Sequence, residues 1–118
     1  MKAIIILLLS ATVAASAAAA ESPSPVRLVL QAHRFTPEKI TVPAGQKVRI
    51  ELVNEDGALE EFDSVDLNVE RDVTPHGKVT FEIGPLKPGA YSFMGELHAD
   101  TARGEVVAVA SEASPPAR

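Results

Sequence analysis

The sequence predicts an all-β domain, a Greek-key β-sandwich or barrel of about eight strands. Two observations lead to this fold class. After residue 20 no helical periodicity is evident, whereas short runs rich in Val, Ile and Phe recur between Pro, Gly and Asn residues. We expect strands at residues 26–31, 39–42, 46–53, 61–65, 68–73, 78–83, 90–94 and 105–109.

The strand pattern is clearest at residues 47–53, which read KVRIELV. Charged and apolar side chains alternate there, so one face of the strand contacts the core and the other contacts water. Val79, Phe81 and Ile83 repeat the alternation. Turn-forming sequences separate the runs: PAG at 43–45, NEDG at 54–57, PHG at 75–77 and PLKPG at 85–89.

The N-terminus has the order of a secretory signal peptide. A charged start at Lys2 precedes a short apolar stretch and then a tract of small residues that ends at Ala20. The apolar stretch is shorter than the ~20 residues that a membrane-spanning helix needs. We therefore expect cleavage after Ala20 and export to the periplasm, rather than a buried N-terminal helix or an uncleaved anchor.

Removing 20 of the 118 residues leaves 98, which suits one domain with one core. We expect a short linker at 21–25, the domain at 26–110 and a disordered tail at 111–118. The net charge is −5 and no basic cluster is present, so we expect no nucleic-acid partner. The chain has no cysteine, so packing and strand pairing must stabilise the fold.

Acidic residues are concentrated between Asn54 and Glu70, where no Lys or Arg occurs. The run has two interpretations. Either it forms a solvated loop and strand face, or some of its oxygens share a cation that relieves their mutual repulsion. The seven carboxylates are those of Glu55, Asp56, Glu60, Glu61, Asp63, Asp66 and Glu70.

Metal-binding residue types also occur together in the segment between the last two expected strands. Met94, Glu96 and His98 lie within five residues and offer a thioether, a carboxylate and an imidazole. This set suits copper better than zinc or magnesium. Met94 has a second interpretation, because the last apolar residue of a strand also packs in a core.

Two sets of motifs frame the mature chain. The first consists of FTP at 35–37, ITVPAGQ at 40–46 and the run Val48–Asn54. The second consists of YSF at 91–93, then His98, then Gly104 before the final apolar strand. In their order and spacing these motifs resemble the cupredoxins over nearly the whole mature chain. The resemblance implies a cupredoxin-like sandwich whose early acidic loop and last loop meet at one pole.

The chain departs from the blue-copper members of that family. In those proteins one His follows the early Asn loop, while a Cys, a His and usually a weak axial Met come from the last loop. Alignment on YSF puts Gly95 at the Cys position and Ala102 or Arg103 near the Met position, so only His98 is kept. Without a thiolate, a blue-copper electron carrier is excluded.

Three further motifs of the cysteine-free chain are EEFDS at 60–64, IGPL at 83–86 and GELHADTA at 95–102. In this combination the chain is similar to the cupredoxins of bacterial ferrous-iron-uptake systems. The resemblance implies a periplasmic accessory protein, rather than a stand-alone enzyme, that binds copper and transiently iron while ferrous iron is oxidised or handed on. The implied partners are a second periplasmic metal-binding protein and an inner-membrane iron permease.

The missing first His of the family falls on Glu60, or on Glu61 if the loop is one residue longer. Because side chains alternate along a strand, both cannot face the site unless the chain bulges. His76 lies in a Pro-His-Gly turn and is expected to be exposed. The candidate metal ligands are His98, Glu96, Glu60, Glu61 and Met94, followed by His33, Asp63 and Glu70.

Two other functions fit the same residues. A metal-free sandwich would use its acidic strand face to dock a protein, and a periplasmic copper-handling protein would bind the metal without a role in iron uptake. A hydrolase is disfavoured, because the chain has no cysteine and no Ser in a nucleophile elbow.

Overall fold

The structure is a computed structural model that describes residue 3, residues 10–12 and residues 24–110. The expected signal peptide lies almost entirely outside these residues, and the expected tail at 111–118 lies entirely outside them. The strands are β1 (Val26–Gln31), β2 (Arg34–Thr36), β3 (Lys39–Pro43), β4 (Val48–Asn54), β5 (Glu60–Ser64), β6 (Val69–Val73), β7 (Lys78–Ile83), β8 (Gly89–Gly95) and β9 (Arg103–Val109), and one 3-10 helix is η1 (Glu96–His98).

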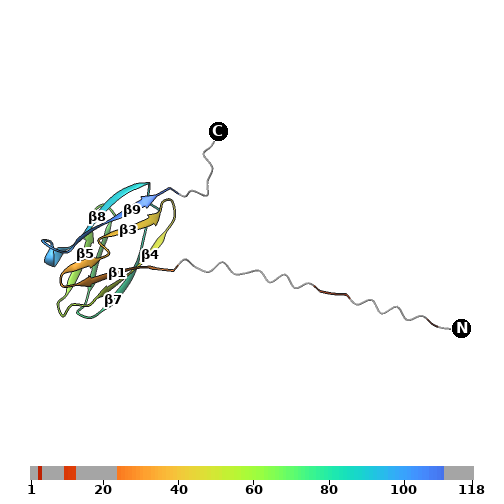
Figure 1. Ribbon diagram of the computed structural model, residues 1–118, viewed down its shortest axis with the longest axis horizontal. Coiled ribbons are helices and arrows are strands. Elements are labelled where there is room, and N and C mark those ends of the chain that lie inside the picture. The colour runs from red at the N-terminus through yellow and green to blue at the C-terminus, as the bar shows by residue number, and fades with distance from the viewer. Residues whose placement is uncertain (1–2, 4–9, 13–23, 111–118) are drawn as a thin grey trace.

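The strands form two sheets that pack face to face (Figure 1). One sheet has the order β2-β1-β4-β7 and the other the order β3-β9-β8-β5-β6. The pairs β1–β4 and β3–β9 are parallel, and the remaining pairs are antiparallel. The predicted all-β sandwich is therefore confirmed.

The sequence prediction missed one strand, β2, which makes nine strands in the described residues where about eight were expected. β2 has only three residues, too few to show an alternating pattern. It pairs with β1 across a two-residue turn of Ala32 and His33, whose φ angles are 52° and 56°. Positive φ at both central residues is the geometry of a tight hairpin turn, usually signalled by Asn or Gly.

Four buried phenylalanines join the two sheets. Phe35 and Phe81 come from one sheet, and Phe62 and Phe93 come from the other. Ring centroids are 5.1 Å apart for Phe35 and Phe93, and 4.9 Å apart for Phe62 and Phe81. Each such pair contributes about 0.5–1.5 kcal/mol beyond the burial of its apolar area. This layer of aromatic rings packs between the two sheets and holds them together.

β5 places an acidic residue on the core side of its sheet. Glu60, Phe62 and Ser64 are buried, whereas Glu61 and Asp63 are partly exposed on the opposite face. Buried Ser64 is satisfied, because its hydroxyl donates to the Ser92 carbonyl at 2.6 Å and accepts from the Leu67 N–H at 3.0 Å. Glu60 is thus the one ionisable side chain on this face of β5.

Three segments that carry candidate metal ligands meet at one end of the sandwich. It comprises residues 32–33, 55–60 and 95–103, and we call it the site pole. In Figure 1 it is the end of the sandwich that lies away from the start of β1 and the end of β9. Among the described residues, no helix has the length and hydropathy needed to cross a membrane.

Candidate metal centre

The centre of the site pole is a contact between a buried carboxylate and an imidazole. Oε2 of Glu60 lies 2.5 Å from Nδ1 of His98. The Glu60 side chain is 1% exposed and that of His98 is 27% exposed. Oε1 of Glu60 accepts from the backbone N–H groups of Glu61 at 3.1 Å and Leu97 at 3.0 Å. A buried carboxylate is tolerated here because three donors replace its water.

The Glu60 carboxylate occupies space that Gly95 leaves empty. A Cβ atom built on Gly95 would lie 2.6 Å from Cδ of Glu60 and 2.9 Å from its Oε1. It would also lie 2.8 Å from Cβ of Ala102. Gly95 is the position at which the cupredoxin resemblance places the missing cysteine, so the carboxylate from β5 stands where that side chain would begin.

The loop after β4 is organised by Asn54, whose side chain is fully buried. Its amide group donates to the carbonyl oxygens of Ala58 at 2.8 Å, Val73 at 3.3 Å and Thr74 at 3.2 Å. Its Oδ1 accepts from the N–H of Asp56 at 2.9 Å. These bonds fix the loop that carries Asp56 and leads to Glu60.

Asp56 in turn holds the β1–β2 turn. Its carboxylate accepts from the backbone N–H groups of Ala32 at 2.7 Å and His33 at 3.0 Å. Burial disfavours the charged carboxylate, but these two bonds and the nearby imidazoles of His33 and His98 outweigh burial. The pKa of Asp56 therefore lies below its usual value.

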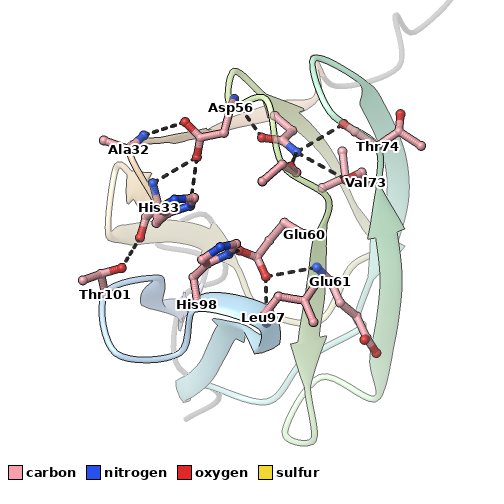
Figure 2. A network of polar contacts seen from close by, with 12 residues as sticks. Ala32, His33, Asp56, Glu60, Glu61, Val73, Thr74, Leu97, His98 and Thr101 are labelled. Atoms are coloured by element: carbon pink, nitrogen blue, oxygen red, sulfur yellow. Dashed lines mark hydrogen bonds and ion pairs between the residues drawn. The ribbon is translucent and has the colours of Figure 1, made fainter.

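His33 reaches the site from this turn. The hydroxyl of Thr101, in the β8–β9 connection, donates to the His33 carbonyl at 2.6 Å and ties the turn to the far side of the pole. The His33 ring stacks on the His98 ring, with centroids 3.7 Å apart and planes 11° from parallel. Figure 2 shows Asp56, His33, His98 and Glu60 following one another across the pole.

Three ligand atoms, one each from His33, Glu60 and His98, lie within 4.8 Å of one another. Nδ1 of His33 is shielded from solvent and has no hydrogen-bond partner among the described residues. Its nearest carboxylate oxygen, Oδ2 of Asp56, is 3.5 Å away, which is ion-pair distance rather than a hydrogen bond. An unpartnered buried donor atom beside a carboxylate and a second imidazole fits a metal site with nitrogen and oxygen ligands.

The side chains need two small adjustments to share an ion. The lone pair of an imidazole nitrogen lies in the ring plane, so nearly parallel rings do not aim at one point. One ring must therefore turn. The Glu60–His98 contact must also open, because metal–ligand bonds are about 2 Å each and a proton alone fits the present separation.

A second cluster, of carboxylates only, lies on the other face of β5. Glu61, Glu70 and Glu96 each bring an oxygen within 4.8 Å of the other two. A side-chain hydrogen bond with Glu70, together with partial burial and the charge of Glu96, raises the pKa of Glu61 to about 7. The neighbouring carboxylates therefore make Glu61 bind its proton more tightly than an isolated glutamate does.

The structure divides the predicted ligands between these two clusters. His98 and Glu60 meet in one, while Glu61 and Glu96 lie in the other. Glu96 and His98 are two residues apart in η1, and a 3-10 helix turns by about 120° per residue, so they point in different directions. That any of these residues binds a metal stays a prediction.

The remaining candidates separate in the same way. Met94 is half-buried on β8 and lies opposite Asp63 in the β5–β8 register. Glu70 joins the carboxylate cluster, whereas Asp63 belongs to neither cluster of ligand atoms. His76 is exposed, as expected for a residue of the Pro-His-Gly turn.

His33 is only a secondary ligand candidate from the sequence. It comes two residues before Phe35, which is buried in the core. His33 lies in a turn with φ 56°, outside the strands, so strand alternation does not place its side chain. The tight turn that brings the ring to the pole has no Asn or Gly to mark it.

Comparison with known proteins agrees with this architecture. Residues 3–108 match the sequence model of the cupredoxin-like domain family. The chain belongs to this family. The cupredoxin-like domain is also 39% identical over 82 residues to an uncharacterized protein of Rickettsia prowazekii (strain Madrid E). That alignment covers 70% of this chain and 66% of the relative, slightly less than two thirds of its length.

Solved structures share the fold at low sequence identity. Auracyanin A, a "blue" copper protein from Chloroflexus aurantiacus, is 14% identical with a TM-score of 0.63, over 75% of this chain and 100% of its own. The metal-binding domain of a Cu(I)-exporting P-type ATPase from Streptococcus pneumoniae is 13% identical with a TM-score of 0.62, over 72% and 84%. A purple cupredoxin from Nitrosopumilus maritimus is 16% identical with a TM-score of 0.55, over 71% and 99%. At these identities the likeness shows the fold alone.

Proposed function

We propose that this cupredoxin-like domain binds copper(II) through His98, Glu60 and His33. The observation that carries the proposal is the buried Glu60 carboxylate in contact with His98, against which the His33 ring is stacked. Imidazole and carboxylate ligands without a thiolate suit Cu(II), which binds such sites more tightly than the other divalent first-row metals. When bound, Cu(II) would supply one-electron redox chemistry and accept an electron from a reductant such as ferrous iron.

We further propose that the protein is a periplasmic accessory of ferrous-iron uptake. The similarity to cysteine-free cupredoxins of such systems motivates this role, with a periplasmic metal-binding protein and an inner-membrane iron permease as partners. Ferrous iron is then the substrate. The two-His, one-carboxylate set is also a donor set that Fe(II) accepts. A copper-handling role without iron is the alternative within the same chemistry.

The copper site is tested by titrating the metal-free protein with Cu(II) against a chelating competitor. We expect His98→Ala to lower the Cu(II) affinity by about 100-fold or more, because it removes one of three donors. His76→Ala is the matched control, since His76 is an exposed turn residue. Equal affinity of wild type and His98→Ala would rule out this site.

The role in iron chemistry has a separate test. Copper-loaded protein is mixed with Fe(II) without oxygen, and the remaining Fe(II) is measured with a ferrous-specific chelator. Loss of Fe(II) in proportion to bound copper supports the iron role. Tight copper binding without loss of Fe(II) favours the copper-handling alternative.

A metal-free interaction module is the second candidate function. The direct Glu60–His98 contact favours it, because each side chain already satisfies the other without an ion. A ligand that binds only the native state raises the melting temperature. If neither Cu(II), Cu(I) nor Fe(II) raises the melting temperature of the wild-type protein, this second function is the better one.

A further inference from the structure

The glycine at the end of β8 has an ordinary backbone conformation. Gly95 has φ −90° and ψ 107°, an extended geometry that any L-residue adopts. Its N–H donates to the Ala102 carbonyl at 2.8 Å, which any residue except proline would also do. The backbone therefore does not require glycine at this position.

What glycine provides here is space. An added Cβ would lie 2.6 Å from the carboxylate carbon of Glu60, closer than Cβ atoms approach other heavy atoms. The Glu60 side chain has little freedom to yield, because it is 1% exposed and three donors hold its two oxygens. A side chain at position 95 and the present Glu60 carboxylate exclude each other.

We propose that Gly95 is a specificity-determining residue of this site, because its missing side chain lets Glu60 present a carboxylate oxygen beside His98. The steric part of this inference stands on the metal-free structure, while its consequence for metal choice rests on the proposed copper site. A carboxylate is a hard anionic ligand that favours Cu(II) over Cu(I). By leaving room for the Glu60 carboxylate, Gly95 thus favours the binding of Cu(II) over Cu(I).

The steric part is tested on metal-free protein with a double-mutant cycle. The free energies of unfolding are measured for wild type, Gly95→Ala, Glu60→Ala and the double variant. We expect Gly95→Ala to cost clearly more stability when Glu60 is present than when residue 60 is Ala. The contact with Ala102 remains in both backgrounds and cancels. Equal costs overturn the inference.

Glu60→Ser replaces Glu60→Ala in the cycle if the alanine variant does not fold. Its short side chain also removes the carboxylate and keeps a hydroxyl group at this position. Gly57→Ala is the matched control, because a Cβ there would meet only Nε2 of His76, at an ordinary 3.7 Å. The loss of unfolding free energy caused by Gly57→Ala is expected to be the same whether residue 60 is Glu or its replacement.

The consequence for the metal is tested by the ratio of Cu(II) to Cu(I) affinity. A general loss of structure lowers both affinities, whereas loss of the carboxylate lowers mainly the affinity for Cu(II). We expect this ratio to fall about tenfold in Gly95→Ala and in Glu60→Gln, with no further fall in the double variant, and to stay unchanged in Gly57→Ala. An unchanged ratio in Gly95→Ala overturns the inference. If the wild type binds neither ion, the proposed function fails, and the metal-free cycle alone decides the role of Gly95.

Discussion

The imidazole ring of His33 stacks on that of His98, with centroids 3.7 Å apart and planes 11° from parallel. Each ring also lies near a carboxylate: Oδ2 of Asp56 is 3.5 Å from Nδ1 of His33, and Oε2 of Glu60 is 2.5 Å from Nδ1 of His98. The row of four side chains joins the β1–β2 turn to β5 and η1, three segments far apart in sequence.

Replacing His33 tests whether the turn supplies a ligand. We expect His33→Asn to lower the Cu(II) affinity about 10- to 100-fold, because it removes one of three donor groups. Asn tolerates the left-handed backbone of this turn, where φ is 56°, so the fold is kept. The affinity is measured by competitive titration and the fold by circular dichroism. Unchanged affinity in a folded His33→Asn protein would leave Glu60 and His98 as the only ligands.

The sandwich could be predicted from the sequence because each strand and each turn is marked by residues that are close together in the chain. The alternation at residues 47–53 matches β4, and the turn sequences mark the ends of most strands. The buried side of β5 was not predictable from Glu60 and Glu61 alone, since a shift of one residue exchanges the two faces of a strand. The burial of Phe62 in the core settles it, because Glu60 lies two residues earlier on the same face and is thus turned inward toward His98.

The composition of the site was harder to predict for a physical reason. Its parts meet through contacts between residues up to 68 positions apart, such as the bond from Thr101 to the His33 carbonyl. Glu96 was expected to share a cation with His98 because it is two residues away in sequence, and Glu61 because it is next to Glu60 at the position of the family's missing His. Strand alternation and the pitch of η1 direct them to the opposite face.

Asp56 is expected to stabilise the β1–β2 turn in a pH-dependent way. Asp56→Ala leaves two backbone N–H groups without their acceptor and should cost about 1–2 kcal/mol near neutral pH. The pKa of Asp56 is lowered from 3.8, so its contribution is fully present above that pH. It is lost as the pH falls through the lower pKa of the folded state.

The measurement is the free energy of unfolding in urea between about pH 2 and 6. The difference between wild type and Asp56→Ala should shrink toward the acid end. Asp100→Ala is the control, because Asp100 is exposed in the loop after η1. A difference that does not change with pH would mean that the charge of Asp56 has no part in holding the turn.

Glu61 should give the opposite pH dependence. The hydrogen bond with Glu70, partial burial and the charge of Glu96 raise its pKa from 4.5 to about 7, so the folded state binds a proton more tightly than the unfolded state. The stability of the wild type should therefore fall as the pH rises from 4.5 to about 7. Glu61→Gln cannot ionise and should lose this dependence.

Melting temperatures of wild type and Glu61→Gln between pH 4.5 and 8 test this expectation. The variant should match the wild type at the acid end and exceed it at pH 8, with a smaller gap in high salt. Glu55→Gln is the control, since Glu55 is an exposed carboxylate outside both clusters. A lower melting temperature of Glu61→Gln at pH 8 would show that the ionised cluster stabilises the fold.

Glu60 offers the sharpest test of how the site pole is held together without metal. Glu60→Gln keeps the shape of the side chain and one oxygen for the N–H groups of Glu61 and Leu97, and should cost about 1 kcal/mol. Glu60→Ala leaves those groups and Nδ1 of His98 without their acceptor and should cost about 3 kcal/mol. Denaturant unfolding of the metal-free proteins measures both values. A Glu60→Ala protein as stable as the wild type would mean that water replaces the carboxylate without loss of stability, and that Glu60 has no part in holding the metal-free site pole together.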